Sequence, residues 1–258
     1  MTQKFSANLG FMWPDRPLLQ RIDAAAAAGF RAIELHWPYD VPAETVRDAC
    51  ARHGVQLLGI NTAVGAQPGD FGLGAQIGRS DDFRAGFDQA ATYARAAGAT
   101  AVHVMAGVVA PQDKPRAHAQ FLENLAYATA QAPDLTLLLE PINQRDKPGY
   151  FYSTIGEAAA IIETVGAGNL KIMFDVYHVG VSEGDVLTRL RRHFADIGHV
   201  QIAAVPSRAE PDEGEIAYGA VFAALDQIGY AGWVGCEYKP RAGTNEGLVW
   251  LKTLGATL

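Results

Sequence analysis

The sequence predicts a single (β/α)₈ barrel. Short apolar runs rich in β-branched residues alternate with longer amphipathic runs about eight times along the chain. The chain has 258 residues, close to the roughly 250 that are typical of one such barrel. A doubly wound open sheet alternates in the same way, but no Gly-x-Gly-x-x-Gly motif follows the first strand. We therefore expect one barrel domain over residues 1–258.

The short apolar runs are the expected strands, and they read as parallel because a helical run separates each from the next. In order they cover residues 5–11, 32–36, 55–61, 100–105, 135–140, 170–175, 197–202 and 233–237.

The longer runs are the expected helices, and glycines mark the ends of several of them. Gly29, Gly54, Gly98 and Gly255 each follow an amphipathic run, in the position that glycine favours after a helix. The expected helices cover residues 17–28, 42–53, 81–97, 114–130, 154–165, 183–193, 215–227 and 246–254.

The composition limits the classes of partner. Apolar residues make up 49% of the chain and charged residues 19%, which supplies a large core and argues against disorder. The formal net charge is −7, and there is no run of Lys and Arg, so we do not expect nucleic-acid binding. The acidity still allows an anionic substrate, because one local arginine can hold a carboxylate.

Segments that would mark another cellular setting are absent from the sequence pattern. Cys50 and Cys236 do not form a Cys-x-x-Cys pair, which argues against a disulfide scaffold or a zinc cluster. Residues 1–6 lack the apolar core of a signal peptide, and the apolar run 24–28 is far too short to span a bilayer. We expect a soluble, cytoplasmic protein without membrane contact, and leave open whether it forms a homo-oligomer.

Polar side chains stand at or near the ends of the last four expected strands. Glu140, Asp175 and Glu237 end theirs, and Gln201 lies near the end of the strand between Asp175 and Glu237. In a (β/α)₈ barrel the carboxyl ends of the strands meet on one face, where active sites lie. We therefore expect these four side chains to meet.

Three carboxylates gathered in one place repel one another, and a divalent cation is the simplest remedy. Carboxylate and amide oxygens suit Mg²⁺ or Mn²⁺ better than zinc or copper. A lone acidic residue after a strand is more often a helix N-cap or a loop carboxylate. Four such polar residues on consecutive strands are harder to explain in that way.

Two further residues are candidates for binding substrate. His178 lies three residues after Asp175 and is expected to polarise a substrate oxygen, the alternative being a loop histidine bonded to backbone. Arg208 follows the seventh strand, and it is either a carboxylate clamp or a surface ion pair with Glu210. His36, Asn61 and His103 end strands two to four, as pocket residues or as structural polar groups.

At these residues the sequence resembles hydroxypyruvate isomerases of the xylose-isomerase-like TIM-barrel superfamily. The resemblance covers essentially the whole chain. The motifs that carry it are Asn8-Leu-Gly-Phe-Met-Trp13, Leu139-Glu-Pro-Ile-Asn143 with Asp146-Lys-Pro-Gly-Tyr150, Phe174-Asp-Val-Tyr-His178, His199-Val-Gln-Ile-Ala203, Arg208 with Glu210-Pro-Asp-Glu-Gly-Glu215, and Gly235-Cys-Glu-Tyr238.

The resemblance implies residue roles and a reaction. Glu140, Asp175, Gln201 and Glu237 would hold the metal, and Glu140 and Glu237 would move protons from opposite sides of the substrate. His178 and Arg208 would bind substrate oxygens. The expected reaction interconverts hydroxypyruvate and tartronate semialdehyde, with a small hydroxy-keto acid as the partner.

Other functions stay open at this point. A 2-oxo-tetronate isomerase would use the same site on a four-carbon acid, with the pocket size set by residues such as Trp13, Trp37 and Phe71. A ketose 3-epimerase is less expected, because related epimerases carry a histidine where this chain has Gln201. A metal-dependent nuclease of this superfamily would carry a three-metal cluster with many more histidines than the seven in this chain. A non-catalytic small-molecule-binding barrel is the remaining alternative.

Overall fold

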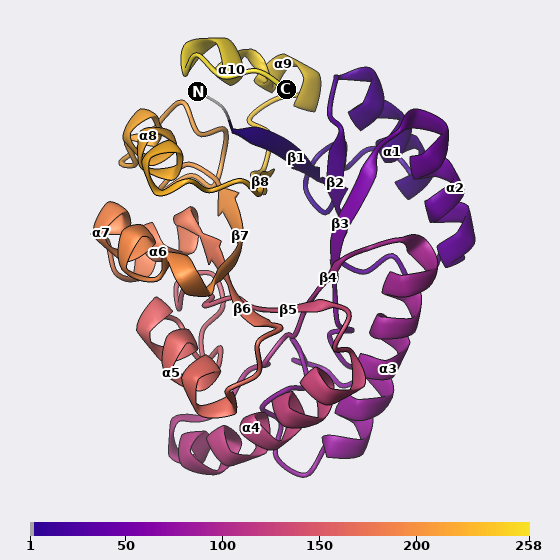
Figure 1. The fold of residues 1–258 in the computed structure, drawn as a ribbon, viewed down its shortest axis with the longest axis vertical. Coiled ribbons are helices and arrows are strands. Elements are labelled where there is room, and N and C mark those ends of the chain that lie inside the picture. Colours follow the sequence, from indigo (N-terminus) through magenta and orange to yellow (C-terminus); the bar gives the residue numbers. More distant parts are fainter. Residues whose placement is uncertain (1–2) are drawn as a thin grey trace.

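The computed structural model describes residues 3–258, and within them eight parallel strands close into a barrel in sequence order, from β1 to β8 and back to β1 (Figure 1). This confirms the predicted (β/α)₈ fold class. The strands are β1 (Lys4–Asn8), β2 (Ala32–Glu34), β3 (Gln56–Asn61), β4 (Ala101–His103), β5 (Thr136–Leu139), β6 (Leu170–Asp175), β7 (Ile197–Ile202) and β8 (Trp233–Cys236).

Helices surround the barrel and cover the outer face of the sheet (Figure 1), and closure of the barrel encloses the inner face. Along β6, successive residues are buried on both sides, as Ile172, Met173 and Phe174 show. The helices are α1 (Leu18–Ala27), α2 (Ala43–His53), α3 (Ser80–Ala97), α4 (Lys114–Gln131), α5 (Ile155–Val165), α6 (Val176–Ser182), α7 (Val186–Arg192), α8 (Tyr218–Ile228), α9 (Thr244–Gly247) and α10 (Val249–Thr253), with 3₁₀ turns at Pro111–Asp113 and Phe194–Asp196.

Local sequence signals fix several helix ends. Gly54 and Gly98 follow α2 and α3 in the left-handed conformation, with φ of 63° and 84°. That conformation is cheap for glycine and ends the helix by turning the chain. At the start of α5, Thr154 and Glu157 form a reciprocal capping box.

Several predicted boundaries are wrong, including those of the strands expected over 32–36 and 100–105, which end at Glu34 and His103. The first strand was expected to reach Phe11 but ends at Asn8, whose side chain accepts a bond from the Gly10 N–H and turns the chain. The helix expected over 183–193 is shorter, because Asp185 takes a positive φ of 49° before α7, and a separate helix, α6, follows β6 directly. The helix expected over 246–254 is divided into α9 and α10.

Strand register sets which side chains can meet at the carboxyl ends. Asp175 on β6 pairs in register with Gln201 on β7, and Gln201 pairs with Gly235 on β8. Glu140 and Glu237 are the first residues after β5 and β8, not the last strand residues as expected. Asp175 and Gln201 are therefore level with each other, and Glu140 and Glu237 follow their strands at the same, carboxyl end of the barrel.

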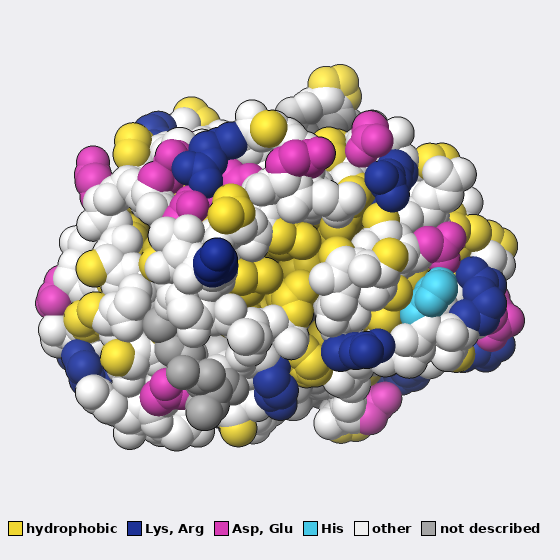
Figure 2. Space-filling view, turned by 90° about the horizontal axis from the view of Figure 1, so that it is seen from above, with side chains coloured by type: hydrophobic (Ala, Val, Ile, Leu, Met, Phe, Trp, Pro, Cys, Tyr) yellow, Lys and Arg dark blue, Asp and Glu magenta, His cyan; other side chains and the backbone are white. Residues whose placement is uncertain are grey.

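The outer surface carries mixed charge. On the side of the barrel that bears α9 and α10, Lys and Arg side chains are dispersed among Asp and Glu, and apolar side chains gather near the middle (Figure 2). Among the helices of residues 3–258, none has the length and apolar character needed to cross a membrane.

Candidate active site

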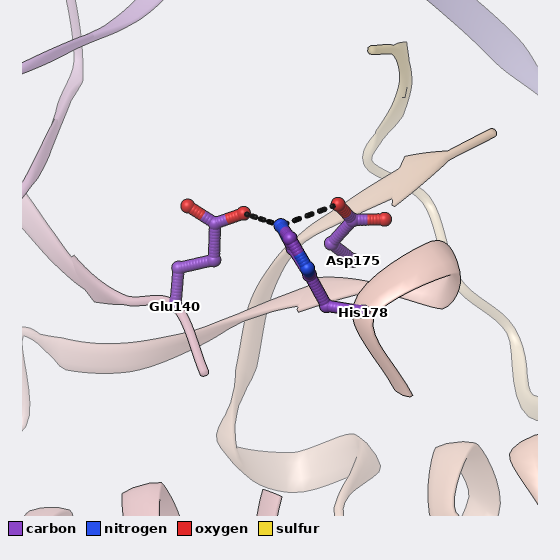
Figure 3. A group of neighbouring side chains, drawn as sticks. All are labelled: Glu140, Asp175 and His178. Atoms are coloured by element: carbon purple, nitrogen blue, oxygen red, sulfur yellow. Dashed lines mark ion pairs between the residues drawn. The ribbon is translucent and has the colours of Figure 1, made fainter. Parts of the chain in front are cut away.

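The carboxylates of Glu140 and Asp175 meet at the imidazole of His178 (Figure 3). His178 Nε2 lies 3.5 Å from Glu140 Oε1 and 3.5 Å from Asp175 Oδ2. All three residues are almost fully buried. One ligand atom from each lies within 4.8 Å of the others, which is compact enough for a common cation.

Asp175 presents one oxygen to the site and uses the other locally. Its Oδ1 accepts a 2.8 Å bond from the N–H of Tyr177 and so caps α6. Its Oδ2 is buried and has no hydrogen-bond partner within residues 3–258. Burial and the charge of Glu237 raise the pKa of Asp175 to about 7. An exposed helix N-cap would not explain these properties, whereas a ligand oxygen would.

Gln201, like Asp175, has one side-chain atom that is hydrogen-bonded locally and one that has no partner among the described residues. Its amide nitrogen donates a 2.8 Å bond to Glu34 Oε2, while its carbonyl oxygen is buried without a partner among the described residues. Orphaned oxygens on Asp175 and Gln201, adjacent in register, fit a divalent cation with hard oxygen ligands. The residues present thus suit the divalent metal that the sequence pattern implied.

Glu237 lies in a different electrostatic setting from Glu140. Its Oε1 is 2.9 Å from His36 Nε2 and accepts a 3.2 Å bond from Asn8, and its Oε2 accepts a 3.3 Å bond from Arg208. Burial alone would raise the pKa of Glu237, but the bond from His36 and the charge of Arg208 outweigh it, so the pKa lies below the ordinary value.

For Glu140, burial followed by the charges of Glu237 and Asp175 raises the pKa well above the ordinary value. The site therefore holds two glutamates whose surroundings push their proton affinities apart, which is the pattern of an acid and base pair. His103 Nδ1 lies 3.3 Å from Glu140 Oε2, so the histidine that ends β4 does face the site. Burial lowers the pKa of His103 to about 4 and keeps it neutral.

His178 is held as a neutral donor. The backbone N–H of Asn143 donates to its Nδ1 at 3.3 Å, so the single ring proton of the neutral form sits on Nε2. Burial and the charge of Arg208 lower the pKa of His178 well below its usual value. Its Nε2–H lies between the two carboxylates, 3.5 Å from each, without a hydrogen bond to Asp175 Oδ2. It is thus free to donate to a substrate oxygen, a role that suits it better than ligation of a metal.

Arg208 belongs to this site and not to the surface pair with Glu210. Glu210 is fully buried and is paired with Arg241 at 2.9 Å. Arg208 instead reaches Glu237 at 3.3 Å and Asp146 at 3.3 Å.

The rings of Phe11 and Tyr177 lie 5.0 and 4.9 Å from the Arg208 guanidinium carbon. The Arg208 backbone is strained, with φ of 56°, and hydrogen bonds from its own N–H to Ala204 and from Lys239 to its carbonyl hold it there. Such preorganisation suits a residue that must aim a planar fork at a ligand.

Sequence reasoning missed Glu34, and it misassigned Trp13. Trp13 is buried, packs edge-on against Phe30 and bonds Asn245, so it is a core residue and not a pocket wall. Trp37 is 40% exposed and contacts Phe71 at the rim.

Glu34 lies under the site against Ser6, His199 and Gln201. Burial alone would raise the pKa of Glu34, but the charge and hydrogen bond of His199 lower it below the ordinary value. The sequence signal for Glu34 is that it is a charged residue inside the apolar run 32–36.

The chain is similar to known proteins over nearly its whole length. A 2-oxo-tetronate isomerase of Cupriavidus necator is 47% identical over 253 residues, covering 96% of this chain and 97% of that protein. A putative hydroxypyruvate isomerase of Homo sapiens is 43% identical over 262 residues, covering 97% and 94%.

Among solved structures, a protein described as AP endonuclease, family 2, from Brucella melitensis superposes with a TM-score of 0.94 at 37% identity, covering 97% of this chain and 98% of that one. The family model for the xylose isomerase-like TIM barrel matches residues 22–254. With near full-length relatives well above 30% identity and a closed eight-stranded barrel, this chain belongs to the xylose isomerase-like TIM barrel family.

Proposed function

We propose that this protein is an isomerase that interconverts hydroxypyruvate and tartronate semialdehyde. The observation that carries the proposal is the placement of two buried glutamates, Glu140 and Glu237, at the carboxyl end of the barrel beside an orphaned aspartate oxygen. In the cation-free protein their pKa values are shifted in opposite directions, which supports different roles for the two. The names of the curated relatives support the reaction class. Carbonyl migration between neighbouring carbons needs a base, an acid and stabilisation of a developing oxyanion, and this residue set can supply them.

Glu140, Asp175, Gln201 and Glu237 would hold a divalent cation, and their oxygens favour Mg²⁺ or Mn²⁺. When bound, the cation supplies Lewis-acid stabilisation of negative charge that develops on the substrate oxygens. The orphaned oxygens of Asp175 and Gln201 are the atoms that most need such a partner.

Glu237 is the residue we assign as base in the hydroxypyruvate direction. His36, Asn8 and Arg208 stabilise its ionised form through direct contacts that require no cation. Glu237 would take a proton from C3 of hydroxypyruvate, and the electron pair would form the C2–C3 double bond of an enediolate. Delivery of a proton to C2 from Glu140, with transfer of the O3 hydroxyl proton to O2, gives tartronate semialdehyde.

Arg208 and His178 would hold the substrate. The guanidinium of Arg208 can bind the substrate carboxylate in exchange for its contact to Asp146, while its contact to Glu237 is kept. The Nε2–H of neutral His178 can donate to a carbonyl or hydroxyl oxygen placed between Glu140 and Asp175. Together they orient the C2–C3 bond between the two glutamates.

A second candidate is the isomerisation of a four-carbon 2-oxo-tetronate. The 47% identity to a 2-oxo-tetronate isomerase favours it. The chemistry is unchanged, because the substrates differ only in a hydroxymethyl group on C3 in place of hydrogen. Trp37 and Phe71, which contact each other at the rim, are the residues expected to set room for that group.

The test is a substrate panel with Mg²⁺ or Mn²⁺, containing hydroxypyruvate, tartronate semialdehyde, a four-carbon 2-oxo acid and a ketohexose. Glu140→Gln and Glu237→Gln should each reduce turnover by about 10²- to 10⁴-fold while the barrel stays folded. Glu123→Gln, on the exposed side of α4, is the matched control and should retain full activity.

Solvent deuterium tests the route. Exchange of the transferred hydrogen with solvent supports the enediolate, whereas strict retention indicates a hydride shift or a shielded proton. Near-full activity of either glutamine variant on the preferred substrate would contradict the two-glutamate scheme. Turnover of the ketohexose alone would favour an epimerase, and no turnover of any compound would favour a binding protein.

A further inference from the structure

Glu34 is a buried acid directly beneath the candidate site that the proposed mechanism does not use. It is 5% exposed and ends β2, on the opposite side of the barrel from the residues of β6. Its Oε1 accepts a 2.5 Å bond from Ser6 Oγ and lies 3.1 Å from His199 Nε2. Its Oε2 accepts a 2.8 Å bond from the amide nitrogen of Gln201.

This arrangement dictates which way the Gln201 amide faces. A carboxylate offers only acceptors, so the group of Gln201 that faces Glu34 must be the NH₂ and not the carbonyl. The carbonyl oxygen is then turned the other way, where it is buried and has no hydrogen-bond partner within residues 3–258. Asp175, whose Oδ2 is also orphaned, lies beside Gln201 in register.

We propose that Glu34 is a positioning residue for the cation site, fixing the Gln201 amide so that its carbonyl oxygen is presented to a divalent cation. The inference rests on the proposed role of Gln201 as a ligand. An amide left free to rotate would present NH₂ to the cation in part of its population, and that orientation cannot ligate. Partners behind metal ligands commonly set their orientation in this way.

Glu34 is itself held rigidly enough for that task. Ser6 and His199 fix one carboxylate oxygen, which leaves the other to hold Gln201. Strand β8, on the far side of β1 from β2, makes room for Glu34, because an added Cβ at Gly235 would lie 2.3 Å from Glu34 Oε1. The glycine of the Gly235-Cys-Glu-Tyr238 motif is thereby explained, because Glu34 occupies the space that a side chain at position 235 would need.

A simpler alternative is that Glu34 serves as the buried counter-charge of His199. In that case its negative charge would influence the cation through space, whether or not Gln201 is present. A double-mutant cycle separates the two cases, because a positioning residue acts only through the group it positions.

The experiment measures the affinity of the substrate-free protein for Mn²⁺ by isothermal titration calorimetry. Glu34→Gln should lower that affinity by about 10- to 100-fold, because an amide at position 34 no longer forces one orientation on Gln201. Gln201→Ala should lower it as well. Adding Glu34→Gln to Gln201→Ala should cause no further loss. Glu123→Gln is the matched control and should bind as the unaltered protein does.

Each outcome decides between explanations. If Glu34→Gln lowers the Mn²⁺ affinity equally in the unaltered protein and in Gln201→Ala, the positioning role is overturned in favour of a through-space effect of charge. Loss from Gln201→Ala with none from Glu34→Gln overturns this inference and leaves the proposed function standing. Unchanged affinity in Gln201→Ala overturns the ligand assignment of the proposed function itself, and this inference with it.

A second variant covers the case in which Glu34→Gln does not fold. Glu34→Asp keeps a negative charge opposite His199 but withdraws the acceptor from Gln201 by one methylene. Reduced Mn²⁺ affinity in a folded Glu34→Asp protein, seen by circular dichroism, supports positioning. A folded Glu34→Asp protein with undiminished affinity would overturn it.

Discussion

Replacing Gly235 with alanine tests the packing beneath the candidate site. The added Cβ would lie 2.3 Å from Glu34 Oε1 and 2.9 Å from its Cδ, far inside van der Waals contact. The carboxylate would have to retreat by about 1 Å, which stretches its bonds from Ser6 and Gln201 beyond the ordinary hydrogen-bond range.

The expected loss follows from those contacts. Overpacking typically costs about 1–3 kcal/mol, and weakening a buried hydrogen bond to a charged group costs a similar amount. We expect Gly235→Ala to lower the free energy of unfolding by about 2–4 kcal/mol. For a chain of this size that corresponds to a fall in Tm of roughly 5–15 °C. Mn²⁺ affinity should fall as well, since Glu34 moves.

The assay is urea and thermal unfolding of the cation-free protein, with Gly86→Ala as the matched control. Gly86 lies within α3 and a Cβ there would meet nothing within 4 Å, so alanine should stabilise by about 0.5–1 kcal/mol through helix propensity. The two substitutions should thus change the free energy of unfolding in opposite directions. A Gly235→Ala protein as stable as the unaltered one would refute the close packing of Glu34 against β8.

Three further predictions concern charge and pH. In the cation-free protein the pKa of Asp175 is raised to about 7, so the folded state keeps a proton that the unfolded state loses above about pH 4. The free energy of unfolding should therefore fall as pH rises from about 4 to about 7. Asp175→Asn should remove this pH dependence from the free energy measured by urea unfolding. An unchanged pH dependence would contradict the raised pKa. His36→Ala removes a contact that lowers the pKa of Glu237, so the acid limb of the kcat/KM profile should move to higher pH, and a limb that stays in place would show that His36 does not tune the base. Arg208→Lys keeps the charge but loses the fork, so kcat/KM should drop roughly 10- to 100-fold, mainly through KM; a loss confined to kcat would argue against carboxylate binding.

Particular residues show how far sequence reasoning reached. Glu140, Asp175, Gln201 and Glu237 were predicted to lie near one another because parallel strands in a closed barrel bring their carboxyl ends to one rim. Their separation along the chain did not matter, since the strand that carries each one could be recognised from its apolar run. The structure brings Glu140 and Asp175 together at His178, and sets Gln201 beside Asp175. Their roles as ligands and catalysts are for the experiments above to test.

Other features depended on contacts that no local pattern reveals. From the sequence, Arg208 was either a carboxylate clamp or a surface ion pair with Glu210. Only the fold shows that Glu210 pairs with Arg241 and that Arg208 contacts Glu237. Trp13 looked like a pocket wall, yet it enters the core beside Phe30. In each case the choice depends on which side chain a loop brings near, and loop geometry is set by tertiary packing.

The sequence by itself determined the fold class, the family resemblance and the positions at which polar side chains meet the barrel rim, because alternation of strand and helix is a local property of the chain. Only the tertiary structure decided how those side chains are paired. Barrel closure places Glu34 of β2 against Gln201 of β7, 167 residues away, and against Gly235 of β8. Contacts of that range arise when the last strand joins the first, and the shared burial then sets each proton affinity and the direction in which each oxygen faces.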